Sequence, residues 1–430
     1  MVRLQFYLKA RALDGPVSIG QDWNVTSPAI LHTIGPRMSG NQIITIATEA
    51  ADETAAAMDI AASGELSDAG LCVLFATTGY DLDRLGKALA KIGINNAIGA
   101  TTGCAIGTHG FQKHGISGFY LPPQRFVVVD ALIEDVARFG LPDARQLARS
   151  MRDQHKRLAS DTSKAMFGVV IADAGAHCEE RLIAALGMEF AGIPLVGGSA
   201  GDVYFNPAQD LPDAKRLLYK GSAVKNAALF CLISSQTPVH ALSHNHYVAG
   251  NSKVVITDAD PERRLVREIN GRPALAEYAK ACGFRRPPKS VADYARYPLM
   301  IRIGGQYFAR GVQRLYPDGS IEFACAIESG VVAAIAQPQD MLARLEDMFA
   351  DLSKTVGPPE LIIGFECAAR TVFMEQTGIT KQISRVLQRN RVVGFAALGE
   401  QFNTVHVNNS FTALAIAATG VPAAGEPAPG

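Results

Sequence analysis

The chain has 430 residues, of which 48% are hydrophobic and 19% charged, so it has ample material for packed cores and is too long for a single one. Its 41 basic residues balance 41 acidic ones, which removes the positive charge typical of nucleic-acid-binding and polybasic membrane-surface proteins. The seven cysteines form no C-x-x-C pair, which argues against a disulfide framework or a thiolate zinc site and favours a reducing compartment.

No targeting or membrane segment is evident in the sequence. Residues 1–12 contain only a broken apolar run, unlike the continuous apolar segment of a signal peptide. A transmembrane helix needs about 18 or more consecutive apolar residues, and no such run occurs. We therefore expect a cytoplasmic protein with neither a membrane nor a nucleic-acid partner.

Helical patterns and short apolar runs alternate through the first half of the chain. The alanine-rich stretch 49–63 has strong helix propensity and ends before Gly64. Further helices and buried strands follow from the periodicity of apolar residues. The predicted helices are 81–92, 141–159 and 179–188, and the predicted strands are 71–76, 125–129, 167–172 and 194–196.

From residue 223 to 257 the pattern changes to consecutive strands, with a hairpin break predicted at residues 249–251. Prolines and charges then interrupt the pattern between 283 and 296. Beyond this point we predict strands at 299–303, 307–312, 321–326, 361–365 and 392–395, and helices at 341–352 and 368–387. Together the elements predict a mixed α/β (α+β) fold in which mixed β-sheets are covered by helices.

The interruption divides the chain into two predicted domains. An N-terminal extension, 1–40, precedes a domain at 41–284 and a second domain at 285–418. The final residues, 419–430, are rich in proline, alanine and glycine and are expected to form a disordered tail.

A weak internal repeat accompanies the strands. Gly99 to Gly103 and Gly197 to Gly201 both read Gly-x-(Ser/Thr)-x-Gly after a short apolar strand, and residues 392–395 occupy a comparable place. One interpretation is a set of duplicated units around a shared ligand cleft; the other is coincidence among 40 glycines. The cleft hypothesis names these residues: Thr101, Gly103, Gly198, Ser199 and Gly201.

Two residues in these turns are candidate nucleophiles. Ser199 lies in a pattern similar to the nucleophile elbow of serine hydrolases, but the required helix is missing, since residues 202–207 end in a proline. A structural glycine turn is the favoured interpretation there. Cys104 is either a reactive thiol or, as we expect without a basic neighbour, a small buried apolar residue.

The histidines are more informative. Strand alternation over residues 239–247 would place His240, His244 and His246 on one face, with His244 and His246 roughly 7 Å apart. Imidazoles can bind zinc, although no neighbouring carboxylate or thiol completes a site, or a haem iron, which needs only one of them. The alternative is a polar strand edge facing solvent. His406 is a further candidate ligand with the same alternative.

At these segments the sequence resembles the FIST domain proteins, which are sensors with a FIST N and a FIST C domain. The resemblance spans about residues 64–417, and it is specific through the combination of these segments: 196–202, 254–261, 268–274, 277–279, 364–370, 393–395, 399–402 and 406–412. It labels the two predicted domains as FIST N-type and FIST C-type.

Residues 243–245, 257–261 and 270–274 are most similar to the subgroup of FIST proteins that bind haem and sense nitric oxide. That resemblance implies a b-type haem held by a histidine, here His244, and regulation of a separate histidine kinase. The subgroup tends to have an aromatic residue at the position of His246, which keeps His246 as an alternative ligand.

The sequence thus favours a sensor without enzymatic activity. Two further hypotheses remain open: a FIST sensor of another small metabolite, such as an amino acid, that uses the cleft near the glycine turns without haem, and a serine hydrolase that uses Ser199.

Overall fold

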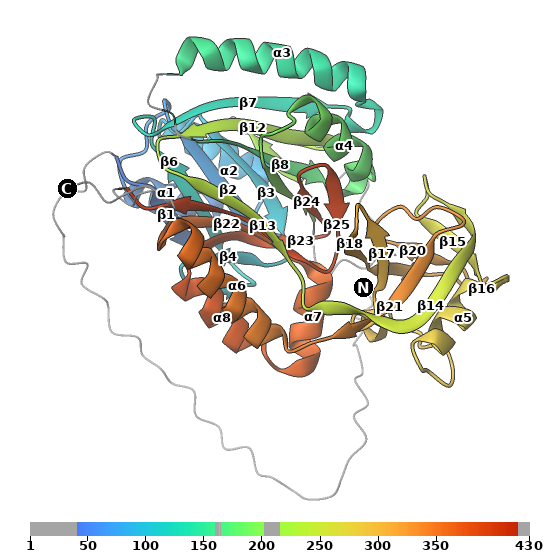
Figure 1. Ribbon diagram of the computed structural model, residues 1–430. Helices are drawn as coiled ribbons and strands as arrows, with labels where there is room; N and C mark the ends of the chain where they lie inside the picture. The colour runs from blue at the N-terminus through green and yellow to red at the C-terminus, as the bar shows by residue number, and fades with distance from the viewer. Residues whose placement is uncertain (1–40, 160–162, 164, 202–215, 420–430) are drawn as a thin grey trace, which may run out of the picture. The chain divides into compact units, whose positions relative to one another are not determined.

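The fold is built on three strand–helix–strand units whose two strands run parallel. The computed structural model describes residues 41–159, 163, 165–201 and 216–419 (Figure 1). The units are β2 (Leu71–Thr77), α2 (Leu82–Lys91) and β3 (Ala97–Thr102); β8 (Ala165–Asp173), α4 (Glu179–Glu189) and β9 (Leu195–Ala200); and β22 (Pro359–Cys367), α7 (Ala368–Thr377), α8 (Thr380–Arg389) and β23 (Val392–Ala397).

Each unit lies at the centre of a six-stranded sheet with the same strand order. The first sheet runs β1 (Ile44–Thr48), β6 (Ile116–Leu121), β2, β3, β10 (Leu217–Tyr219), β11 (Ser222–Val224). The second runs β7 (Phe126–Glu134), β12 (Ala227–Ser235), β8, β9, β24 (Glu400–Phe402), β25 (Val405–Val407). The third runs β13 (Val239–His244), β26 (Phe411–Ala417), β22, β23, β4 (Ala105–Gly107), β5 (Gly110–Gln112).

The last two strands of each sheet are a hairpin supplied by another unit. The hairpin after β3 joins the third sheet, the hairpin after β9 joins the first, and the hairpin after β23 joins the second. The exchange is therefore cyclic, and each unit completes the sheet of another. It also means that segments from both predicted domains share sheets.

A glycine makes the close approach within each parallel pair possible. A Cβ atom at Gly99, Gly197 or Gly394 would lie 2.1, 2.1 or 1.7 Å from the backbone oxygen of the facing residue on the neighbouring strand. Any side chain there would push the two strands apart, so only glycine fits. The repeat suggested by the sequence is thus a structural repeat of three units.

The inner faces of the three sheets share one apolar core, and helices cover the outer faces. Phe395 packs against Phe75 and Phe365, with ring centroids 5.0 and 5.4 Å apart. Both faces of the central strands are buried, which explains their continuous apolar runs. The covering helices are α1 (Glu53–Ala62) and α2, then α3 (Leu141–Leu158) and α4, then α6 (Met341–Val356), α7 and α8 (Figure 1).

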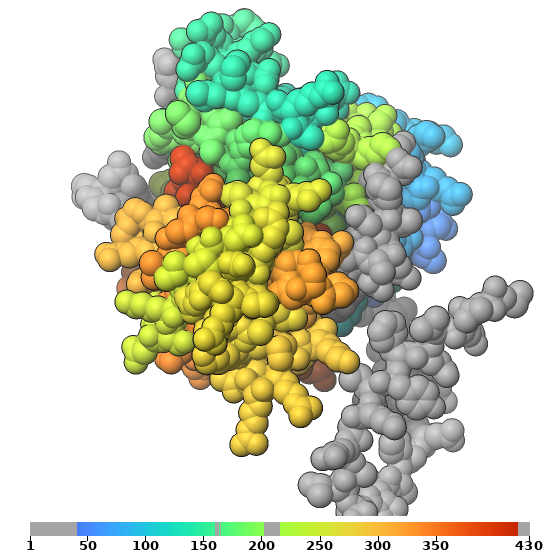
Figure 2. All heavy atoms as spheres, turned by 90° about the vertical axis from the view of Figure 1, so that its right-hand side faces the viewer, coloured from blue at the N-terminus to red at the C-terminus, as the bar shows by residue number. Residues whose placement is uncertain are grey.

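A fourth, eight-stranded sheet with helix α5 (Ala274–Ala281) forms what we call the lobe, residues 247–338. It carries its own core, which includes Tyr278 and Phe323, and its yellow and orange surface occupies much of the face seen in Figure 2. Its strands are β14 (Tyr247–Asp260), β15 (Leu265–Ile269), β16 (Arg272–Pro273), β17 (Leu299–Ile303), β18 (Gln306–Arg310), β19 (Val312–Leu315), β20 (Ile321–Phe323) and β21 (Val332–Pro338).

The predicted mixed α/β class, with helices covering mixed sheets, is confirmed. Two local predictions were wrong. The helix predicted over 368–387 is two helices, because Gly378 adopts a left-handed conformation (φ +71°) that ends α7. The hairpin break predicted at 249–251 is an irregularity of register within the continuous strand β14. The segment 283–296 lies within the lobe.

Residues 1–40, 202–207 and 420–430 lie outside the described part of the chain, so the predictions made for them stay predictions. Among the described residues, none of the helices combines the length and apolar character that crossing a bilayer requires.

Candidate functional site

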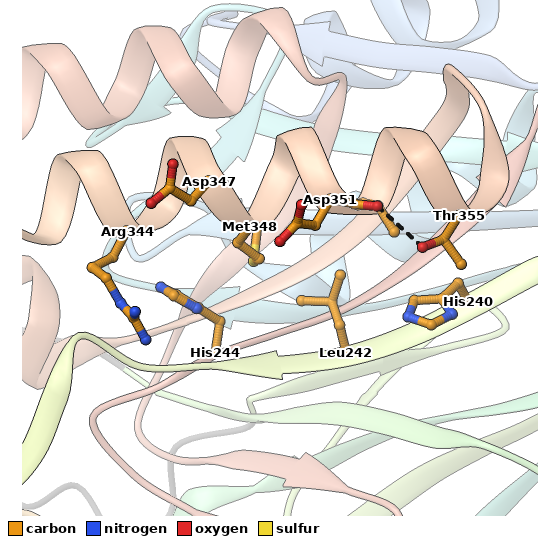
Figure 3. A pocket seen from close by; sticks show the side chains of 9 residues that line it. His240, Leu242, His244, Arg344, Asp347, Met348, Asp351 and Thr355 are labelled. Atoms are coloured by element: carbon orange, nitrogen blue, oxygen red, sulfur yellow. Dashed lines mark hydrogen bonds between the residues drawn. The ribbon is translucent and has the colours of Figure 1, made fainter.

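Strand β13 forms one wall of a groove whose other wall is α6. The strand lies at the edge of the third sheet, where it pairs only with β26 among the described strands, so its alternate side chains are free to face α6. The groove has a volume of about 320 Å³. It is lined by His240, Leu242 and His244 from β13 and by Arg344, Asp347, Met348, Asp351, Leu352 and Thr355 from α6 (Figure 3).

His244 has the properties of a neutral nitrogen ligand. Burial, with smaller contributions from Arg370 and Arg344, lowers the pKa of the imidazole to about 3, so it is uncharged at neutral pH. Its buried Nε2 atom has no hydrogen-bond partner among the described residues. Figure 3 shows the ring directed from the strand toward α6, with Arg344 beside it. A neutral imidazole with a free nitrogen is the group that binds iron in haem proteins.

The rest of the groove is part apolar and part charged. Leu242, Met348 and Leu352 offer apolar surface, and Arg344 offers a cation that can meet an anionic group of a ligand. Asp347 and Asp351 carry negative charge on the same helix. On the side of His244 and Arg344 the orphan nitrogen, the apolar contacts and the cation therefore occur together, a combination that suits an amphipathic ligand.

His246 does not lie on the face of β13 that carries His240 and His244. The prediction that all three histidines share one face was therefore wrong for His246. β13 ends at His244, and the side chain of Asn245 accepts a hydrogen bond from the Tyr247 amide at 3.0 Å, a turn that breaks the alternation. His246 is fully buried, its ring centroid 4.7 Å from that of Phe373 and its Nδ1 atom 3.2 Å from Arg370 Nη1. Burial and then Arg370 lower its pKa to about 2.

A second cavity, of about 360 Å³, lies where β13 meets the lobe. Its lining is more polar than that of the groove and includes Ser243, Asn245, Asn408 and Ser410 together with lobe residues 306–309. The buried Oδ1 atom of Asn408 has no hydrogen-bond partner among the described residues. Hydroxyl and amide groups of this kind fix the orientation of a small polar ligand.

The two glycine turns named in the cleft hypothesis lie side by side. Thr102 and Gly201 form a parallel β-bridge, and the Gly103 amide donates to the Gly201 carbonyl at 3.2 Å. Of the five cleft residues, Thr101 is partly exposed, whereas Gly103, Gly198, Ser199 and Gly201 are buried. The turns thus pack closely against one another.

Neither candidate nucleophile has the surroundings of one. Ser199 is 0% exposed within β9, and its hydroxyl accepts a hydrogen bond from Gln401 Nε2 at 2.9 Å, an amide that is not a base. Burial raises the pKa of the Cys104 thiol to about 11, which keeps it protonated. Both arrangements match a structural role for these side chains.

His406 lies apart from the groove, in a buried polar cluster between the second sheet and the lobe. Its Nδ1 atom is 3.1 Å from the Glu400 carbonyl oxygen, and Cys325, Glu179 and Glu180 surround it. Burial lowers its pKa, but Cys325 and the two carboxylates outweigh this and raise the pKa to about 9. Sequence reasoning missed these neighbours, because Glu180 and Cys325 are far from His406 along the chain and carry no local motif.

Comparison with known proteins identifies the two parts of the chain. A family model described as the FIST N domain matches residues 70–272, and one described as the FIST C domain matches residues 274–403. No curated protein matches the chain. A solved structure titled "Cyanuric acid hydrolase: evolutionary innovation by structural concatenation" is 12% identical over 87% of this chain and 99% of that chain, with a TM-score of 0.33, too low to support an argument.

FIST domains are small-ligand sensing domains, which agrees with the two cavities on either side of β13. Because the two matches together cover well over half of the sequence, the chain belongs to the FIST family, with a FIST N domain followed by a FIST C domain.

Proposed function

We propose that this protein is a cytoplasmic nitric-oxide sensor that holds a b-type haem in the groove between β13 and α6 and has no catalytic step of its own. The observation that carries the proposal is the state of His244, a neutral imidazole whose buried Nε2 atom has no partner among the described residues. An unpaired buried polar atom is costly, and a ligand that accepts its lone pair removes that cost.

Different residues of the groove would contact different parts of the haem. His244 would bind the iron, Leu242 and Met348 would pack on the macrocycle, and Arg344 would pair with a propionate. When bound, haem supplies an iron that binds nitric oxide. The proposed sensing role of the protein itself is to position His244 and to transmit any change in its position.

The connection of β13 to the lobe offers a route for that change. Only Asn245 and His246 separate the end of β13 from the start of β14, and His246 is held by Arg370 and Phe373 of α7. A shift of His244 would therefore act on the join between the third sheet and the lobe. We propose that a separate histidine kinase reads this difference by binding the two states with different affinity.

Reconstitution with haem tests the site directly, and the chain supplies a matched control. His240 and His244 lie on the same strand and line the same groove. We expect His244→Ala to abolish the Soret band and His240→Ala to retain it, because of these two histidines only His244 presents a buried nitrogen without a partner among the described residues. Equal bands in both variants, or loss only in His240→Ala, would reject His244 as the ligand.

The polar cavity on the other side of β13 supports a second candidate, a sensor of a small metabolite such as an amino acid without haem. The unpaired amide oxygen of Asn408 is available to such a ligand's ammonium or hydroxyl group. Calorimetric titration with free amino acids would show binding that Asn408→Leu removes. If none of them binds the wild-type protein, this second candidate fails.

A further inference from the structure

Three side chains of metal-ligating types lie close together at the junction of the second sheet and the lobe. Glu180, Cys325 and His406 each present a ligand atom, and these atoms all lie within 4.8 Å of one another. Glu180 lies in the first turn of α4, His406 in β25, and Cys325 in the lobe after β20. Cys325 is 0% and His406 2% exposed, whereas the Glu180 side chain is 31% exposed, so the three groups lie between the interior and the surface.

A second observation, independent of the clustering, concerns the two nitrogens of His406. Nδ1 lies 3.1 Å from the Glu400 carbonyl, which can only accept, so this nitrogen carries a proton. Nε2 is buried and has no hydrogen-bond partner among the described residues. A histidine whose Nδ1–H is held by a backbone carbonyl while its Nε2 is left free has the orientation of a metal ligand.

We propose that these three residues bind Zn²⁺, with Glu180 oxygen, Cys325 sulfur and His406 Nε2 as ligands. One soft sulfur, one imidazole and one carboxylate form a set that zinc accepts, whereas calcium and magnesium require oxygen ligands throughout. Three protein ligands leave the fourth tetrahedral position for water or a small anion.

The surrounding charges fit a divalent cation. Arg264 Nη2 lies 2.5 Å from a carboxylate oxygen of both Glu179 and Glu180, while the other Glu180 oxygen accepts from the Ala326 amide at 2.7 Å. When zinc binds, the Cys325 thiol and the His406 imidazolium each release one proton to solvent, so that the metal replaces the Nε2 proton and is bound by a thiolate and a neutral imidazole. Two carboxylates and one thiolate are then balanced by Arg264 and the metal.

Zinc bound by these three residues would link the lobe to the second sheet through its coordination bonds. Cys325 belongs to the lobe, whereas Glu180 and His406 belong to the helix and hairpin of the second sheet, and the Arg264 ion pairs cross the same junction. The site is separate from the groove at His244, since the two share no lining residue. Its occupancy can therefore be tested whether or not the protein binds haem.

Metal analysis of the purified full chain tests the proposal. We expect about one zinc per chain in wild-type protein and close to none in Cys325→Ala and His406→Ala. Cys282→Ala, which removes a half-buried thiol from the same lobe, serves as the control and should keep its zinc. Circular dichroism would establish that each variant is folded.

Cobalt provides a test that needs no variant. Wild-type protein stripped of metal and loaded with Co²⁺ should show a thiolate-to-cobalt charge-transfer band and the visible bands of a four-coordinate ion. Folded wild-type protein that contains no zinc after growth in zinc-supplemented medium, and that takes up neither added Zn²⁺ nor Co²⁺, would overturn the proposal. Zinc retained in folded Cys325→Ala would do the same.

Discussion

Replacing Gly394 with alanine is expected to prevent stable folding or to lower the free energy of unfolding by about 4 kcal/mol or more. A Cβ atom at this position would lie 1.7 Å from the carbonyl oxygen of Gly364 and 2.7 Å from its carbonyl carbon. Both atoms are backbone within the central parallel pair of the third sheet, so no side chain can move away to make room. Chemical denaturation of the two proteins would measure the difference.

Gly79→Ala is the matched control for this change. Gly79 is exposed in the turn after β2, and its added Cβ would meet only His114 Nδ1, at 3.9 Å. We expect its free energy of unfolding to stay within about 0.5 kcal/mol of the wild-type value. A Gly394→Ala protein as stable as Gly79→Ala would show that β22 and β23 do not approach as closely as described.

Replacing Arg370 with methionine is expected to lower the free energy of unfolding by about 3–5 kcal/mol, because it leaves Glu366 buried without its partner. Arg370 and Glu366 are both 0% exposed; Arg370 Nε donates to Glu366, and its Nη1 lies 3.2 Å from His246 Nδ1. Burial already raises the pKa of Glu366, and losing Arg370 raises it further.

The loss of stability in Arg370→Met is expected to depend on pH, because the pKa of Glu366 is raised in the folded protein. A folded pKa above the ordinary carboxyl value of 4.5 means that the folded state holds a proton that the unfolded chain releases, so the destabilisation grows as the pH rises above 4.5. Glu366→Gln combined with Arg370→Met should recover part of the loss at neutral pH. Arg389→Ala, which breaks an exposed pair with Glu346, should cost no more than about 1 kcal/mol. A double variant no more stable than Arg370→Met alone would contradict this interpretation.

The central elements of the fold were predictable because their physical signals are local. Strand β2 is a continuous apolar run since both of its faces are buried, and Gly99 and Gly197 mark strands that must approach a neighbour closely. The cyclic exchange of hairpins was not predictable, because β4 pairs with β23 almost 300 residues away. Gly378 could have indicated the break between α7 and α8, since glycine is favoured at helix ends.

The candidate site shows the same division between local and distant signals. Alternation along β13 correctly places His240 and His244 together, because it depends only on neighbouring residues. The burial of His246 depends on the Asn245 turn and on Arg370, which lies on another element. The contacts among Glu180, Cys325 and His406 arise only when the lobe meets the second sheet, so no spacing in the sequence could indicate them.

The absorption spectrum of wild-type protein purified from cells that make ample haem tests the proposed sensor most directly. We expect a Soret band in the purified protein that shifts when nitric oxide is added to the reduced form, because a free His244 nitrogen beside apolar side chains is suited to a b-type haem. Colourless protein that takes up no added haem, although correctly folded, would contradict it.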